Sequence, residues 1–381
     1  MPDRFEFATA GRILFGPGAL RDFQPANFGK RAFVCGGHNR KRLAPLLELL
    51  DNARVEHTEF EVATEPTLEL ISSAVETARS FQPDFLIGMG GGSVIDAAKA
   101  TVALVSNSGP ILDYLEVIGQ GKPLVNAPVP MIAIPTTAGA GAEVTRNAVI
   151  TSPQHLVKVS LRSPLMLPRL ALVDPELTLD LPPELTASTG MDALTQLIEP
   201  YVSARANPMT DLICVSGIHA AARALPLAYH NPGDLPARTQ MSLASLYGGM
   251  ALANAGLGAV HGFAAAIGGM FQAPHGAVCA RLLEPVMRAN IEAVKKVPRI
   301  LERYTHTAQL LIGNLHVKAI DGASWVHDLC STLQIPRLGA YGISEKDLHE
   351  ICTKAAASSS MKANPVPLPL PLLREILSAA L

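Results

Sequence analysis

The stretch DFLIGMGGGSVIDAAKA, residues 84–100, decides the fold. It begins as a short apolar run, passes through a cluster of small residues, and continues from Val94 with apolar residues at helical spacing. Backbone can approach a phosphate closely only where side chains are absent, and the N–H groups that begin a helix hold negative charge. The order of strand, turn and helix therefore predicts a phosphate site. Because the glycines depart from the GxGxxG pattern, a tight turn without a ligand is the alternative. The residues of the predicted site are Gly90, Gly91, Gly92 and Ser93.

The same alternation extends over the first half of the chain. Short apolar runs rich in β-forming residues alternate with segments of helical periodicity, such as 68–81 and 94–105. The strand-like runs cover residues 31–37, 55–62, 84–90, 130–136 and 170–176. After Pro182 such runs disappear, and Ala- and Leu-rich helical segments follow one another. This pattern predicts an α/β domain with a largely parallel Rossmann-like sheet in residues 1–180, followed by an all-helical domain in residues 181–381.

A second loop of small residues, PTTAGAGAEVT at residues 135–145, also follows an apolar run. It places Thr136 and Thr137 at the carboxyl end of a strand, where ligands collect in open α/β sheets. Two such loops beside one another would bind an extended, phosphorylated ligand, and a dinucleotide is a ligand of this kind. On the helix after the first loop, Asp96 and Lys99 stand one turn apart. Asp96 either helps to orient bound groups or forms a solvated pair with Lys99.

Two distant segments carry residue types that bind metals. Asp192 and Gln196 lie at i and i+4 of a predicted helix, so both side chains project from one face. His261 and His275 lie in a long, mostly apolar stretch. Imidazole and carboxylate both ligate zinc and ferrous iron, so these residues form a candidate divalent-cation site. Hydrogen-bonded core histidines are the alternative, because no dense ligand motif links these positions.

Composition disfavours several classes of function. The chain has 381 residues, of which 17% are charged, and a formal net charge of -2, so it has no electrostatic reason to bind nucleic acid. Five scattered cysteines without CxxC spacing indicate neither a disulfide framework nor a cysteine zinc site. The N-terminal residues lack the apolar core of a signal peptide, so we expect a cytoplasmic protein. Residues 239–280 contain no Asp, Glu, Lys or Arg, but their Gly, Ala and interspersed polar residues favour a buried helical core over a membrane span.

Together these segments resemble the iron-containing alcohol dehydrogenase family over nearly the whole chain. The resemblance rests on GGGSVIDAAK, PTTAGAGAEVT, LVDPEL, TGMDALTQLIEPYVS, GAVHGFAAAIGGMFQAPHG and KANPVPLPLPLLREILSAAL, in the family's order. It implies an N-terminal dinucleotide-binding domain, a C-terminal metal- and substrate-binding domain, a small alcohol or carbonyl substrate, and a homodimer. It also implies that the cofactor's phosphates are bound by Gly90, Gly91, Gly92, Ser93 and Asp96, with Thr136, Thr137 and Thr145 nearer the nicotinamide.

For catalysis the resemblance implies Asp192, His261 and His275 as three of the family's four metal ligands. The family pattern DALTH is DALTQ here, so Gln196 stands in place of an imidazole, and Ala265 stands where the family has a further histidine. An amide oxygen is a weaker and harder donor than imidazole, so Fe²⁺ or Zn²⁺ should bind less tightly and the preference drifts towards Mn²⁺. Fe²⁺ remains the expected cation, with Zn²⁺ and Mn²⁺ as alternatives. Three donors still bind a cation and leave a position for substrate.

The loop VCGGHNRKR, residues 34–42, bears on the choice of cofactor. An acidic residue after this strand would bond the ribose 2′-OH of NAD and repel the 2′-phosphate of NADP. Gly36 and Gly37 stand there instead, with Arg40 close by. The loop therefore favours NADP, with NAD left open and a basic surface turn as the alternative.

The predicted function is that of a metal-assisted, NAD(P)-dependent oxidoreductase that interconverts a small alcohol and its aldehyde or ketone by hydride transfer. One alternative is a metal-independent reductase similar to maleylacetate reductase, although those relatives lack the aspartate that this chain keeps as Asp192. A lyase similar to dehydroquinate synthase is a second alternative, and a non-catalytic binder of metal or nucleotide is a third.

Overall fold

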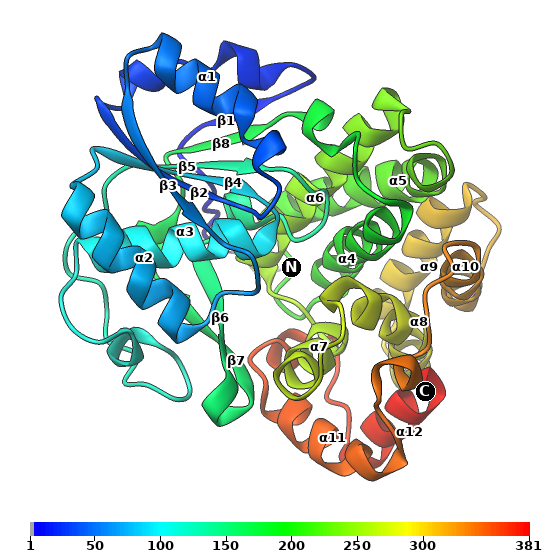
Figure 1. The fold of residues 1–381 in the computed structure, drawn as a ribbon. Helices are drawn as coiled ribbons and strands as arrows, with labels where there is room; N and C mark the ends of the chain where they lie inside the picture. Colours follow the sequence, from blue (N-terminus) through cyan, green and yellow to red (C-terminus); the bar gives the residue numbers. More distant parts are fainter. Residues whose placement is uncertain (1–3) are drawn as a thin grey trace. The chain divides into compact units, whose positions relative to one another are not determined.

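The computed structural model describes residues 4–381, which form two compact units (Figure 1). One unit contains residues 9–137 and 141–179, and the other contains residues 4–8, 138–140 and 180–381. Each unit has a hydrophobic core of its own, and each is described separately below.

The first unit is built on a six-stranded sheet in the order β1-β8-β5-β4-β2-β3. Every neighbouring pair in this sheet is parallel, which confirms the predicted Rossmann-like sheet. The strands are β1 (Ile13–Phe15), β2 (Arg31–Gly36), β3 (Glu56–Glu61), β4 (Phe85–Gly90), β5 (Met131–Pro135) and β8 (Leu170–Val173). A separate antiparallel pair consists of β6 (Asn147–Ser152) and β7 (Val157–Arg162). The sequence patterns did not predict β1, β6 or β7.

Helices cover both faces of this sheet because successive strand residues point to opposite sides. In β2, Phe33 and Cys35 belong to the core that includes α2 (Leu68–Phe81) and α3 (Gly92–Val105). The alternate residues of the same strand pack in a second core with α1 (Ala44–Asn52). Figure 1 shows α2 and α3 on one side of the sheet and α1 on the other. Burial on both faces explains why the central strands β2, β4, β5 and β8 are largely apolar runs.

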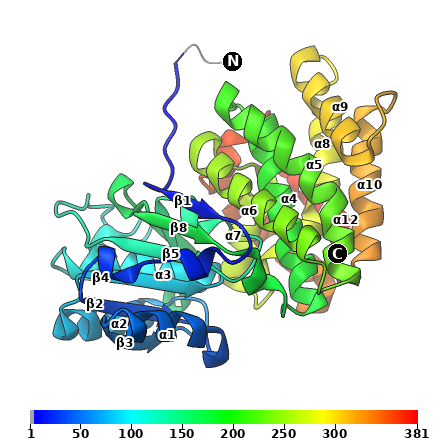
Figure 2. The ribbon, with the colours of Figure 1, turned by 90° about the horizontal axis from the view of Figure 1, so that it is seen from above.

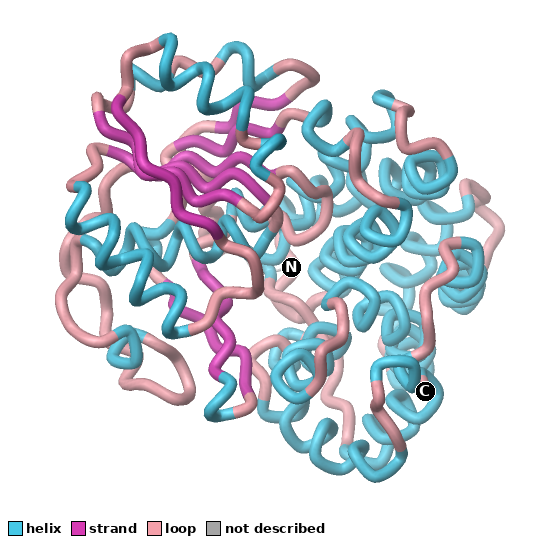
Figure 3. The backbone as a smooth tube through the Cα atoms, in the orientation of Figure 1, coloured by secondary structure: helices cyan, strands magenta, loops and turns pink. Residues whose placement is uncertain are grey.

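The second unit is helical, and the structure contains no strand within residues 180–381, all of which it describes (Figure 3). Its long helices α4, α5 and α6 pack against one another, as Figure 2 shows. The helices are α4 (Pro183–Val202), α5 (Pro208–His230), α6 (Leu235–Ala255), α7 (Ala259–Met270), α8 (His275–Ala293), α9 (Pro298–Ile312), α10 (Ala319–Thr332), α11 (Leu348–Ala357) and α12 (Leu370–Ala380). The observed architecture confirms the predicted fold class.

The charge-free stretch 239–280 runs through α6 and α7 into α8. Helix α5 is long and apolar enough to cross a membrane by length and composition, and so are α6 and α7 together, although a bend of 98° separates them. Many residues of these helices lie in the core of the helical unit, among them Ala244 and Phe263. Core helices of soluble proteins have the same composition.

Candidate active site

The glycine turn joins β4 to α3 with a close approach that only glycine allows. A Cβ atom on Gly90 would lie 2.5 Å from the side chain of Val94, inside van der Waals contact. Helix α3 begins at Gly92, two residues before the predicted start at Val94, with Gly91 as its N-cap. The first N–H groups of a helix have no partner within it, so this turn offers hydrogen-bond donors to an anion.

The predicted cofactor residues of three strands meet at one edge of the sheet. Gly36 at the end of β2 pairs with Met89 of β4, and Gly90 pairs with Pro135 at the end of β5. The backbone N–H of Thr136 donates to the carbonyl oxygen of Gly90 at 2.9 Å. A Cβ atom on Gly91 would lie 3.5 Å from the side chain of Thr137. The two small-residue loops therefore lie side by side, which is the arrangement predicted for a dinucleotide site.

Asp96 and Thr145 form a buried network with Lys99. The Lys99 ammonium, which is fully buried, bonds Thr145 Oγ1 at 2.8 Å and Asp96 Oδ1 at 2.9 Å. The other Asp96 oxygen accepts the N–H of Val149 in β6 at 2.9 Å. A solvated Asp96–Lys99 pair, one of the two alternatives from sequence, is therefore excluded. Beside this network, burial raises the pKa of Glu143 to about 7, which its own backbone N–H and Lys99 partly oppose.

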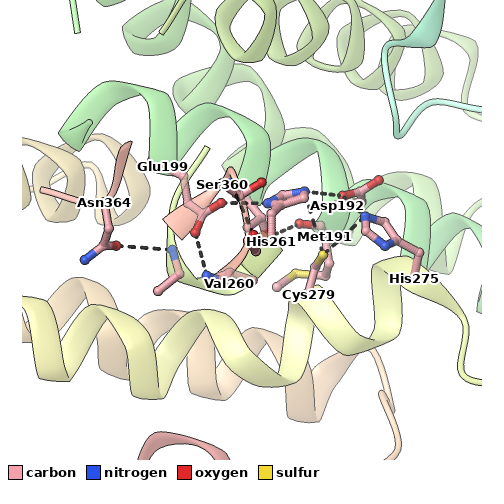
Figure 4. Close-up of polar contacts among 12 residues, drawn as sticks. Met191, Asp192, Glu199, Val260, His261, His275, Cys279, Ser360 and Asn364 are labelled. Carbon is pink, nitrogen blue, oxygen red and sulfur yellow. Dashed lines mark hydrogen bonds and ion pairs between the residues drawn. The ribbon is translucent and has the colours of Figure 1, made fainter. Parts of the chain in front are cut away.

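The predicted metal residues converge on one point of the helical unit (Figure 4). Asp192 lies on α4, His261 on α7 and His275 at the first position of α8. Asp192 Oδ1 is 3.3 Å from His261 Nε2 and 3.7 Å from His275 Nε2. Asp192 and His261 are buried, whereas the His275 side chain is 38% exposed, so the cluster opens on the side of His275.

Close helix packing brings His275 to Asp192. A Cβ atom on Gly276 would lie 2.0 Å from the carbonyl oxygen of Ser188, so only glycine lets α8 approach the backbone of α4 this closely. On the other side of α4, a Cβ atom on Gly190 would meet the side chain of Leu225 at 2.3 Å. The glycines flanking the predicted ligands therefore serve to bring the helices together.

Glu199 contacts Nδ1 of His261, the ring nitrogen that does not face Asp192. It was not identified from the sequence. Its Oε2 lies 2.6 Å from His261 Nδ1, and its Oε1 accepts the N–H of Val260 at 2.7 Å, at the start of α7 (Figure 4). A carboxylate is stabilised at a helix N-terminus, and it holds the proton on Nδ1 so that Nε2 faces Asp192. A signal was present, because Glu199 follows Asp192 by seven residues and shares its helix face.

Cys279 is the second residue that the sequence analysis missed. Its Sγ lies 3.7 Å from His275 Nε2 and 3.8 Å from His261 Nε2. In residues 4–381 these four side chains form the group whose ligand atoms all lie within 4.8 Å of one another: Asp192, His261, His275 and Cys279. The signal was the i, i+4 spacing of His275 and Cys279 on α8, which a search for CxxC pairs does not test.

Gln196, predicted as a ligand in place of an imidazole, lies beside Asp192. It hydrogen-bonds the Asp192 carboxylate and thereby helps to lower the pKa of that group. Its Oε1 is buried without a partner and would lie 3.7 Å from a Cβ atom on Gly248 of α6. Ligation by Gln196 therefore stays a prediction.

The charged groups of the cluster shift one another's pKa values. Burial opposes ionisation of Asp192, but His275 and His261 outweigh it and lower the pKa of the carboxyl. Burial likewise opposes a charge on His261, yet Cys279 and Glu199 raise its pKa well above the usual value. One buried carboxylate with two imidazoles and a thiol beside it is a donor set that a divalent cation satisfies. The residues present therefore fit the metal that the family resemblance implies.

Comparison with known proteins shows the family to which the chain belongs. Residues 10–175 match the family model described as iron-containing alcohol dehydrogenase, and residues 186–381 match the model of that family's C-terminal part. An NADPH-dependent butanol dehydrogenase of Clostridium saccharobutylicum is 34% identical over 94% of this chain and 93% of its own. A choline dehydrogenase of Bacillus subtilis is 33% identical over 84% of this chain and 80% of its own. A 1,3-propanediol oxidoreductase structure has a TM-score of 0.92 at 31% identity, covering 99% of this chain and 100% of that one. The chain therefore belongs to the iron-containing alcohol dehydrogenase family, as an NAD(P)-dependent oxidoreductase of alcohols.

Proposed function

We propose that the chain interconverts a small alcohol and its aldehyde or ketone at a divalent cation held by Asp192, His261 and His275. The convergence of one carboxylate and two imidazoles carries the proposal, because these donors bind zinc and ferrous iron. In this proposal residues 1–180 form the dinucleotide-binding domain, and residues 181–381 form the metal- and substrate-binding domain.

When bound, the cation polarises the substrate oxygen and the nicotinamide accepts or supplies the hydride. Glu199 keeps the proton on Nδ1 of His261 and leaves Nε2 free for the cation. The substrate approaches from the side of His275, whose side chain is the exposed member of the three ligands. Ala265 has no group that relays a proton, so in this proposal the alcohol proton passes to solvent.

We further propose NADP as the preferred cofactor. Gly36 and Gly37 put no carboxylate beside the position of the 2′-phosphate. Arg40, whose guanidinium lies 2.7 Å from both carboxylate oxygens of Glu59, can exchange that partner for a phosphate. The butanol dehydrogenase relative supports this choice, because its name specifies NADPH.

A cytoplasmic homodimer completes the proposal. It is supported by the family resemblance and by a composition with five cysteines in no disulfide pattern. Light scattering on the purified protein and fractionation of the source cells test these two points.

The test combines elemental analysis with an activity screen over small alcohols, aldehydes and 2-oxo compounds, with NADP(H) and NAD(H). His261→Ala and His275→Ala should each lose the bound metal and turnover, whereas the exposed His219→Ala on α5 should keep both. Full activity in either ligand variant would refute the metal-assisted mechanism.

A further inference from the structure

Cys279 is fully buried and faces the two histidines of the proposed metal site (Figure 4). The structure leaves all five cysteines free and buried, and Cys279 is the one that joins the group of potential ligands in residues 4–381. A cysteine with a purely structural role needs only apolar neighbours, whereas the thiol of Cys279 lies beside polar side chains that can bind a cation.

The spacing of the four ligand atoms is close to that of a tetrahedral site. With metal–nitrogen and metal–oxygen bonds of about 2.0–2.1 Å and a metal–sulfur bond of about 2.3 Å, the edges of a tetrahedron are about 3.3 Å from N to O and about 3.6 Å from S to N. The observed edges are 3.3 Å and 3.7 Å from Asp192 Oδ1 to the two Nε2 atoms. From Cys279 Sγ to the same nitrogens they are 3.8 Å and 3.7 Å. These four edges lie within about 0.4 Å of the tetrahedral values, and all four ligand atoms lie within 4.8 Å of one another.

Gln196 is a poorer candidate for the fourth position. Its side chain hydrogen-bonds the Asp192 carboxylate, and its Oε1 would lie 3.7 Å from a Cβ atom on Gly248 of α6. Rotating the amide to offer Oε1 to a cation would break the bond to Asp192 and place two acceptors together. Holding Asp192 in position is the role that its contacts allow.

We propose that Cys279, as the thiolate, is the fourth protein ligand of the cation and that Gln196 is a positioning residue for Asp192. This proposal rests on the proposed function, because it concerns the same cation. It restores the count of four ligands that the family resemblance implies, and the substrate oxygen would then bind as a fifth ligand. Since the thiolate is a soft donor, it favours Zn²⁺ and Co²⁺ over Mn²⁺, which reverses the drift that Gln196 alone would cause. Binding of the cation releases the thiol proton to solvent.

Cobalt absorption spectroscopy tests the proposal without relying on activity. The full-length protein is stripped of metal and loaded with Co²⁺, and its spectrum is compared with those of Cys279→Ser, Gln196→Ala and Cys214→Ala. Cys214 is the matched control, because it is a buried cysteine on α5 outside the cluster. We expect a thiolate-to-cobalt charge-transfer band in the near ultraviolet for the wild type, Gln196→Ala and Cys214→Ala. Cys279→Ser should lose this band but keep the visible cobalt bands.

Metal competition supplies a second readout. Cys279→Ser should bind Zn²⁺ about tenfold or more weakly, with a smaller change for Mn²⁺. Cobalt bound to the wild type without a charge-transfer band, or a band that survives Cys279→Ser, would overturn the proposed ligand and leave the proposed function intact. If no divalent cation binds the wild type at all, both the ligand and the metal-assisted function are overturned.

Discussion

Glu199→Gln tests how the helical unit prepares its metal ligand. The carboxylate accepts from two buried donors, His261 Nδ1 at 2.6 Å and the N–H of Val260 at 2.7 Å. An amide of the same shape has one oxygen, so it satisfies one of these donors and turns its own NH₂ group towards the other. If NH₂ faces the imidazole, the ring proton moves to Nε2, the atom that must face the cation.

The expected decrease in metal affinity follows from the loss of the carboxylate that orients His261. Removing a partner of a metal-bound histidine lowers metal affinity by about 10–100-fold, or about 1.4–2.7 kcal/mol. The apparent Kd for Zn²⁺ is measured by competition with a chromophoric chelator, with the exposed Glu184→Gln on the same helix as control. A Kd for Glu199→Gln within about twofold of the wild-type value would refute the reasoning, because the carboxylate would then not orient His261.

Three further variants test other parts of the structure. Gly37→Asp should fit, since its Cβ would meet only Val94 at 3.8 Å, and should move the ratio of kcat/KM from NADP towards NAD by about tenfold or more; an unchanged ratio would contradict the proposed 2′-phosphate position. Because burial raises the pKa of Glu143 from 4.5 to about 7, the wild type should lose about 3 kcal/mol of stability as pH rises between these values. Glu143→Gln should flatten that decline in Tm measured from pH 5 to pH 8, and parallel curves would exclude the buried carboxyl as its cause. Gly276→Ala should cost about 1–3 kcal/mol or more and lower metal content, because its Cβ would lie 2.0 Å from a backbone oxygen, whereas Gly339→Ala, with its nearest atom at 3.6 Å, should keep the wild-type Tm.

The central strands could be predicted because their surroundings make them apolar throughout. β2, β4, β5 and β8 lie between helical layers, so every residue except the half-buried Arg31 is buried and the run is visible without alternation. β1 has three half-buried residues at the sheet edge and pairs with a strand over 150 residues later, which no local pattern reveals. β7 reads VKVSLR, in which apolar and polar residues alternate, so a strand signal was present and was missed. β6 reads NAVITS, in which three apolar residues stand together and no such alternation is visible.

The residues of the active site also fall into two groups: those that the sequence reveals locally and those that only the folded structure brings together. Asp192, His261 and His275 could be found because carboxylate and imidazole are rare in such apolar segments, and each is recognisable by residue type alone. Cys279 and Glu199 are different, because residue type alone does not mark them as functional. In a sequence, a buried cysteine cannot be told from any other core residue, and a glutamate at the end of a helix cannot be told from a surface residue. Their roles arise only when Gly276 brings α8 against α4 and the start of α7 presents Val260 to Glu199. Substitution of an expected histidine by Gln196 therefore says little about metal binding on its own, because the atom that compensates for it can come from another helix.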